Sequence, residues 1–563
     1  MQRSLIAVAC GLAATLAHAG PPQPAEVVLR GGVVYTVNPA QPRAQALAVA
    51  AGRILAVGTD AEVAALVGPQ TRVIELAGRT VVPGFRDSHG HLMSLGLARL
   101  SLDLNGTRSY PEIVAKVAEA VKAARPGEWI QGRGWHESKW IERPDPEVRR
   151  FPTHAALSRV SPDNPVVLER ADGHALLVNA KAMALMGISD ETKPPAGGEM
   201  IRDAHGAATG IFVDNAMDLI RVPPPDEARS RRALETALDE CLRKGITSFT
   251  DAGASLEEIA LYERYAAEGR LPLRLYVMVL GLDRLQKLAA PEVGLGGGFL
   301  TLRSVKLLAD GAMGSRGAAL LEPYDDDPGN SGFFTTPPET VLETARYALV
   351  HGWQVATHAI GDRANRMVLD AYARAFAEHP EVKDPRFRIE HAQILDAQDI
   401  PRFGRLGVIA SMQGIHQTSD RPWAADRIGL ARVKEGLYVW RKLLDSGARI
   451  ANGTDTPVED VDPIKCFYAS VARQDEHGNP PGGWEPDQRM TREEALRSYT
   501  LEGAHAAFEE RELGSLEVGK RADLVVLTRD IMSVPPLEIL QARVALTIVD
   551  GKVRSTSDPA VPR

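Results

Sequence analysis

The chain has 563 residues, of which 44% are hydrophobic and 25% are charged, and these fractions are typical of a soluble globular protein. The formal net charge is −8, and the sequence contains no dense run of Lys and Arg that could bind phosphates, so the composition argues against a nucleic-acid-binding protein. At roughly 150 residues per domain the length corresponds to about four domains, but barrel folds form much larger single units.

The N-terminus has the pattern of an export signal. Arg3 is followed by an apolar stretch over residues 5–16, and Ala17-His18-Ala19 matches a small-residue cleavage site. We therefore expect residues 1–19 to be cleaved off and the mature chain to be exported to a bacterial periplasm. Cys10 leaves attachment to a lipid open as an alternative. The apolar stretch is too short to span a bilayer, and no later stretch is long enough, so no membrane span is expected in the mature chain.

Short apolar segments at both ends of the chain predict β-strands. Residues 25–35 show the alternation of apolar and polar residues that is typical of a strand. Residues 47–58 predict a strand, a glycine turn and a second strand. Near the C-terminus, residues 524–527 and 544–548 are also strand-like, and Asp550-Gly551 is a tight hairpin signal. We expect the two ends to form one small β domain together.

Between the two ends, strand-like and helix-like segments alternate. The predicted strands cover residues 246–249, 273–280, 302–308, 354–357 and 386–389, and the predicted helices cover residues 230–244, 340–350 and 366–376. This alternation predicts a parallel α/β barrel. Residues at about 125–225 fit the alternation poorly and are rich in Pro, Gly and Trp, so we interpret them as an insertion that covers one mouth of the barrel.

Two histidines stand at the end of an early apolar run. His89 and His91 follow a Pro-Gly turn, and residues i and i+2 of a strand point to the same side, as does Asp87. Two imidazoles on one side of a strand end can bind the same metal ion. Taken alone, a His-x-His pair is equally consistent with two structural histidines.

Four further polar residues follow or interrupt apolar strand segments: Lys306, His358, His391 and Asp455. In an α/β barrel the carboxyl ends of the strands converge on the active site, so we expect these side chains to meet there. Nitrogen and oxygen donors of this kind suit zinc or a similar divalent ion. Burying a bare ammonium group is costly, so Lys306 is either paired with an acidic group or carboxylated by carbon dioxide, in which form it can bridge two metals.

Longer motifs surround these residues, at positions 82–91, 305–316, 356–362, 388–393, 453–458 and 514–524. Together they resemble the amidohydrolase superfamily, in particular the amidohydrolase 3 type branch that includes N-substituted formamide deformylase. The resemblance implies a distorted (β/α)8 TIM-type barrel over residues 83–511. It also implies a small β-sandwich built from residues 25–82 and 512–557.

The resemblance also implies roles for the strand-end residues: His89 and His91 bind one metal, His358 and His391 bind a second, Lys306 bridges them if carboxylated, and Asp455 contacts a metal and the attacking water. The implied cofactor is a divalent metal, with Zn²⁺ expected, as one or two ions per chain. Asp455 is expected to act as general base towards the water and then as general acid towards the leaving nitrogen.

Four more residues are predicted to bind substrate. His174 and His416 lie near predicted strand ends, and Arg316 follows the Lys306 motif. Trp135 could form an apolar wall, although the family pattern has Asp where His136 follows it. Each has a structural alternative: a core histidine satisfied by the backbone, an internal ion pair, or ordinary core packing.

We expect hydrolysis of a non-peptide carbon–nitrogen bond in a small-molecule amide, formamide or carbamate. Hydrolysis of an ester or lactone is the alternative, because the same activated water attacks any activated carbonyl. A non-catalytic metal- or solute-binding protein is disfavoured, since a site of histidines has no need of Asp455 unless a water must be activated. A homodimer is compatible with the sequence.

Overall fold

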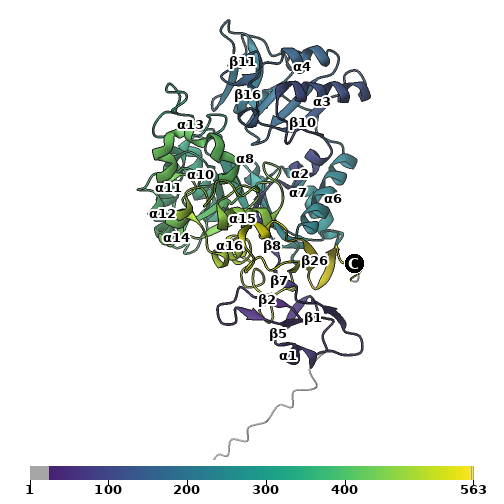
Figure 1. Ribbon diagram of the computed structural model, residues 1–563. Helices are drawn as coiled ribbons and strands as arrows, with labels where there is room; N and C mark the ends of the chain where they lie inside the picture. The colour runs from purple at the N-terminus through teal and green to yellow at the C-terminus, as the bar shows by residue number, and fades with distance from the viewer. Residues whose placement is uncertain (1–23, 560, 562–563) are drawn as a thin grey trace, which may run out of the picture.

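The computed structural model describes residues 24–559 and 561, so the predicted signal at residues 1–19 lies outside the described part of the chain. Three parts follow one another along the molecule: an insertion, a central barrel and a β domain (Figure 1). Within the described residues, no helix is both long and apolar enough to cross a membrane.

The centre of the molecule is a barrel of eight parallel strands. In spatial order they are β24 (Ile450–Gly453), β23 (Ile409–Gln413), β22 (Arg388–His391), β21 (Gln354–Ala359), β20 (Leu300–Leu308), β18 (Arg274–Leu280), β17 (Ile246–Ala254) and β8 (Phe85–Gly90). Helices cover them on the outside, including α6 (Glu227–Arg243), α7 (Leu256–Ala267), α10 (Pro338–His351), α11 (Asp362–Glu378) and α12 (Ile400–Leu406). The predicted barrel is therefore confirmed.

The barrel strands are almost entirely buried because the barrel interior covers one face and the helices cover the other. In β18, for example, every residue from Arg274 to Val279 is buried. Strands β24 and β8 close the barrel: the Asp455 amide donates a hydrogen bond to the His89 carbonyl at 2.7 Å. Asp455 lies two residues after β24, so this bond connects the segment that follows the last barrel strand to β8.

Both chain ends build the β domain, as predicted. One sheet has the order β27 (Lys552–Thr556), β26 (Val544–Val549), β25 (Leu524–Leu527), β7 (Thr80–Pro83), β2 (Val33–Tyr35) and β3 (Arg43–Ala44). A second sheet contains β5 (Arg53–Gly58), β4 (Ala46–Ala50), β1 (Val27–Arg30) and β6 (Arg72–Glu75). Buried side chains from both ends, among them Leu29, Leu47 and Leu524, pack in one cluster. Arg274 connects this domain to the barrel through a buried ion pair with Asp523 at 2.8 Å.

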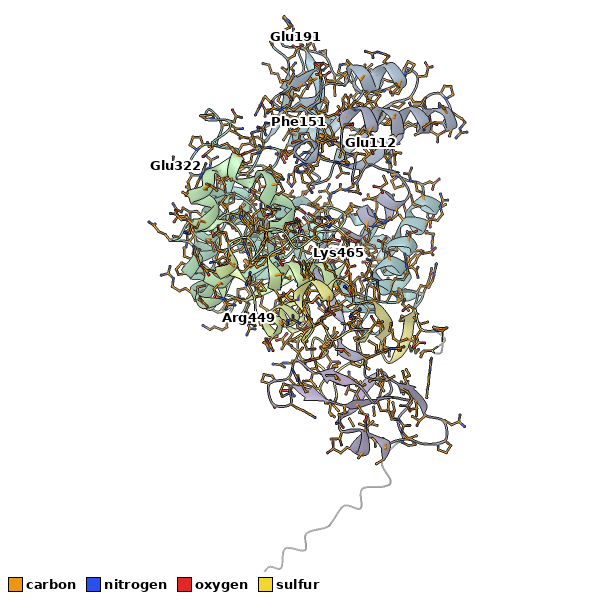
Figure 2. All side chains as sticks on the ribbon, viewed as in Figure 1. Glu112, Phe151, Glu191, Glu322, Arg449 and Lys465 are labelled. Atoms are coloured by element: carbon orange, nitrogen blue, oxygen red, sulfur yellow. The ribbon has the colours of Figure 1, made fainter. Side chains whose placement is uncertain are left out.

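The insertion is a folded α/β unit at one end of the barrel (Figure 1). Its sheet has the order β15 (Gly198–Arg202), β16 (Ala208–Asp214), β14 (Ala175–Val178), β13 (Val166–Arg170), β10 (Ile130–Trp135) and β9 (Leu102–Asp103). The sheet begins at β9, upstream of residue 125, and helix α3 (Tyr110–Ala123) also packs its buried face against the insertion core. Phe151, labelled in Figure 2, lies in this core with its ring 6.4 Å from that of Trp135.

The two ends of the barrel have different surroundings. Arg449 precedes β24 and marks the end that faces away from the insertion (Figure 2), where it pairs with Glu502 at 2.6 Å. The insertion lies over the opposite end of the barrel (Figure 1), where residues at the carboxyl ends of the strands and residues of the insertion line one cavity. Polar residues at the carboxyl ends of the strands therefore meet side chains of the insertion.

Candidate active site

A cavity of about 500 Å³ lies between the carboxyl ends of the barrel strands and the insertion. The barrel contributes His89, His91, Lys306, His358, His391, His416 and Asp455 to its lining. The insertion contributes Arg133, His136, Lys139, Glu169, Asp172, His174 and Asp214. Such a concave site with convergent polar groups is the usual form of a small-molecule binding site.

Local backbone geometry turns two of these side chains into the cavity. His391 has φ 72° and Asp455 has φ 57°, both in the left-handed region that side-chain-bearing residues seldom adopt. His391 ends β22 and Asp455 lies two residues after β24, so the reversal aims each side chain across the barrel mouth. Strained conformations of this kind persist where the surrounding structure holds them, and they concentrate at functional sites.

One group of ligand atoms comes from His89, His91 and Asp455, which lie within 4.8 Å of one another. Oδ1 of Asp455 is 3.4 Å from Nε2 of His89 and 3.2 Å from Nε2 of His91. Nζ of Lys306 lies 3.4 Å from the same His89 nitrogen. The structure thus brings the His-x-His pair, the lysine and the aspartate together.

A second group contains His391, His416 and the same Asp455. Oδ2 of Asp455 is 3.6 Å from Nε2 of His416, a residue that the sequence suggested as a substrate contact. His358 borders this group without belonging to it, with its ring centre 4.6 Å from that of His391. Asp455 therefore stands between two sets of imidazoles.

Buried polar partners fix the outer nitrogens of two histidines. Nδ1 of His89 contacts the carboxylate of Glu390, which also accepts a hydrogen bond from Nε of Arg388 at 2.8 Å. Nδ1 of His391 is 2.8 Å from Oε1 of Gln413. For His391 this leaves the lone pair on Nε2, which is the usual arrangement of a metal-binding histidine, while Nε2 of His89 faces Asp455 at 3.4 Å.

The pKa values of the buried side chains are consistent with binding of a metal ion in the cavity. Burial lowers the pKa of His358 and of His391 well below the ordinary value, which favours the neutral imidazole that binds metals. Burial also raises the pKa of Asp455, but hydrogen bonds from His89 and His91 outweigh it and hold that pKa well below its usual range. Burial lowers the pKa of Lys306 to about 8, so a minor fraction of its amine is unprotonated near neutral pH.

The donor set fits a divalent metal ion. Nε2 of His358 and Nε2 of His416 are buried and have no hydrogen-bond partner among the described residues. Each nitrogen faces a carboxylate oxygen beyond hydrogen-bond range, Asp310 at 3.5 Å from His358 and Asp455 at 3.6 Å from His416. Buried polar atoms are nearly always satisfied in folded proteins, so two such imidazole nitrogens beside carboxylates indicate a binding site for a cation. Several imidazoles with one carboxylate form a nitrogen–oxygen donor set of the kind that zinc and similar ions bind.

Some of the predicted substrate-binding residues line the cavity and others are buried away from it. His174 lines the cavity from the insertion. Trp135 is fully buried in the insertion core, where its indole N–H donates to the Leu168 carbonyl at 2.9 Å. Arg316 is buried and pairs with Asp326 at 2.8 Å. The cavity lining contains neither Trp135 nor Arg316.

Four residues with clear contacts in the site received no role from the sequence: Glu390, Gln413, His136 and Asp214. Glu390 stands directly before His391 and could have been noticed as a carboxylate inside an apolar strand. His136 lines the cavity, whereas its neighbour Trp135 does not. Which of the two faces the cavity depends on the orientation of the end of strand β10. Gln413 and Asp214 are recognisable only from their contacts across the fold.

The sequence and the fold have known relatives. A family model described as "Amidohydrolase family" matches residues 72–554. The putative amidohydrolase YtcJ of Bacillus subtilis is 34% identical, and the match covers 94% of this chain and 99% of that protein. N-substituted formamide deformylase of Arthrobacter pascens is 31% identical over 92% of this chain and 96% of that protein.

Solved structures agree with this match. An uncharacterized metal-dependent hydrolase from Pyrococcus furiosus has a TM-score of 0.70 and 29% sequence identity, and the alignment covers 90% of this chain and 100% of that structure. The shared barrel, the candidate His/Asp metal site and these matches give one conclusion. The chain belongs to the amidohydrolase family and is a metal-dependent hydrolase of that superfamily.

Proposed function

We propose that the protein hydrolyses a non-peptide carbon–nitrogen bond in a small-molecule amide, formamide or carbamate. The observation that carries this proposal is the position of Asp455 between two groups of imidazoles in one cavity. The deformylase named above, whose name describes cleavage of an N-substituted formamide, supports the choice of an amide-type bond. Zn²⁺ is the proposed metal because imidazole and carboxylate donors predominate.

Asp455 is suited to move the proton in this reaction. A metal ion held by these residues would polarise the substrate carbonyl and lower the pKa of a nearby water. The Asp455 carboxylate accepts a proton as the water oxygen forms a bond to the carbonyl carbon. It then delivers that proton to the nitrogen as the carbon–nitrogen bond breaks, so one side chain serves as base and then as acid. The low pKa of Asp455 keeps it ionised for the first step.

Lys306 has the position and the protonation state for carboxylation. Its amine is buried 3.4 Å from Nε2 of His89, and its pKa of about 8 supplies unprotonated nitrogen near neutral pH. Reaction of that amine with carbon dioxide forms a carbamate and releases a proton. The carbamate oxygens would add two anionic donors beside the His89 group.

A substrate panel tests the proposed function. The purified protein is loaded with Zn²⁺ and assayed against N-formyl, N-acyl and carbamate compounds and against lactones, with a chelator-treated sample as control. We expect metal-dependent release of amine from at least one amide-type substrate. Hydrolysis of lactones without any amine release would replace the proposal by an esterase function.

A further inference from the structure

A histidine–aspartate pair lines the cavity from the insertion, on a different element from every candidate metal ligand. His174 lies in the turn between β13 and β14, and Asp214 ends β16. Strands β14 and β16 are paired, with Ala175 opposite Val213, so the register of the sheet sets the two residues side by side. Nδ1 of His174 is 2.5 Å from Oδ1 of Asp214.

The pair reaches the catalytic end of the barrel. The ring of His174 lies 5.1 Å, centre to centre, from that of His358. Because Asp214 occupies Nδ1, Nε2 is the ring nitrogen that remains for a bound molecule. Nε2 has no hydrogen-bond partner in the described part of the chain, and the residue lines the cavity.

The barrel makes room for Asp214. A Cβ atom added to Gly311 or to Gly317 would lie 2.2 Å from Oδ2 of Asp214, so both positions need glycine for this carboxylate to fit. Asp214 itself has φ 48° and ψ −127°, a conformation that is strained for a residue with a side chain. The loop after β20 thus leaves room for this carboxylate next to the cavity.

The surroundings do not satisfy the pair as they would a structural ion pair. Oδ2 of Asp214 is buried without a hydrogen-bond partner among the described residues. By comparison, the nearby Arg170 directs its guanidinium at both oxygens of Glu137, each at 2.8 Å. A strained, incompletely satisfied carboxylate that orients a cavity-facing imidazole has the arrangement of a hydrogen-bond donor and its orienting group.

We propose that His174, oriented by Asp214, is a catalytic residue that the insertion supplies, and that its Nε2 forms a hydrogen bond with the scissile group of the substrate. The substrate would then lie between His174 on the insertion and Asp455 on the barrel. This inference rests on the proposed hydrolysis of a carbonyl compound in the same cavity. It gives the insertion a part in the reaction in addition to covering the barrel mouth.

Three variants and a matched control test the proposal: His174→Asn, Asp214→Asn, the double variant, and His205→Asn on an exposed turn of the same insertion. We expect His174→Asn to lower kcat by about 10²-fold or more and Asp214→Asn by at least about tenfold. Because the pair acts as one unit, the double variant should fall within about threefold of His174→Asn. The control should keep the wild-type kcat, and all four proteins should keep the wild-type metal content and melting temperature.

The proposal is wrong if His174→Asn keeps the wild-type kcat, or if the two single losses multiply in the double variant. A loss of bound metal that parallels the loss of kcat would also overturn it, since His174 would then support the metal site instead of contacting the substrate. The variants are assayed with whichever carbonyl compound the wild-type protein hydrolyses. If that compound is a lactone, the amide assignment fails while this comparison still decides the role of His174.

Discussion

At the scale of single residues, Asp455 is the point where the two groups of imidazoles meet. One carboxylate oxygen faces His89 and His91, and the other faces His416. Removing a proton from water requires a carboxylate that stays ionised, and the hydrogen bonds from His89 and His91 achieve this inside a buried site. The same carboxylate is therefore suited both to binding a metal and to transferring a proton.

The outer hydrogen bonds of the histidines should matter for metal affinity. Replacing Gln413 by Leu removes the oxygen that holds Nδ1 of His391 and frees the ring to rotate. We expect Gln413→Leu to weaken zinc binding by about 10- to 100-fold, measured by competition with a chromophoric chelator. The control is Gln398→Leu at an exposed position, which should bind zinc as the wild type does. Equal affinities of the two variants would show that Gln413 does not position His391.

Some individual residues of the site are predictable from the sequence and others are not. Polar groups at the carboxyl ends of barrel strands usually belong to the active site, and this rule predicts a site made of His89, His91, Lys306, His358, His391 and Asp455. The structure places all six in the lining of one cavity. Trp135 and His136 are neighbours that face opposite ways: the indole donates inside the insertion, whereas His136 lines the cavity, and no local pattern distinguishes the two. The partner of Arg316, Asp326, lies ten residues further along a loop whose path no local pattern determines.

At the scale of elements, the contact between β8 and β24 holds the site together. Thr454 donates from its amide to Oδ1 of Asp87 at 2.9 Å, and its hydroxyl contacts the other oxygen of that carboxylate at 2.5 Å. Asp87 thus connects the first strand of the barrel to the segment that follows the last strand. The sequence placed Asp87 on the same face as the histidines, but only the closed barrel shows what it binds.

Gly453 makes this close approach possible. A Cβ atom at position 453 would lie 2.4 Å from the backbone nitrogen of His89 and 2.7 Å from Oδ1 of Asp87. Relieving that overlap separates the two strands, so we expect Gly453→Ala to reduce the free energy of unfolding by about 1–3 kcal/mol and to lower the metal content. Denaturant unfolding and metal analysis would measure the two effects.

Gly329→Ala is the matched control, because nothing lies within 4 Å of a Cβ atom there and its φ is not positive. It should unfold as the wild type does. If Gly453→Ala were as stable as this control and held the same amount of metal, the strand contact would not be what positions His89 and Asp455.

At the scale of the whole molecule, the site depends on parts that are far apart in the sequence. The barrel provides the candidate metal ligands, the insertion provides the opposite wall, and the two chain ends form the β domain on the other side. Alternating strands and helices were enough to predict the barrel, and short apolar segments were enough to predict the β domain. Helix α3 belongs to the insertion because Ile113 and Val117 pack with its sheet, which depends on long-range packing that periodicity does not show.

The most direct test of the account is the Asp455→Asn variant, with its zinc content and its turnover measured on the same sample. Asn keeps the shape of the side chain and one oxygen that can bind a metal, but it cannot accept the proton of the attacking water. We therefore expect most of the metal to stay bound while kcat falls by about 10³-fold or more. The surface variant Asp163→Asn should keep both. Wild-type turnover by a zinc-loaded Asp455→Asn protein would contradict the assignment of Asp455 as the proton-transferring residue.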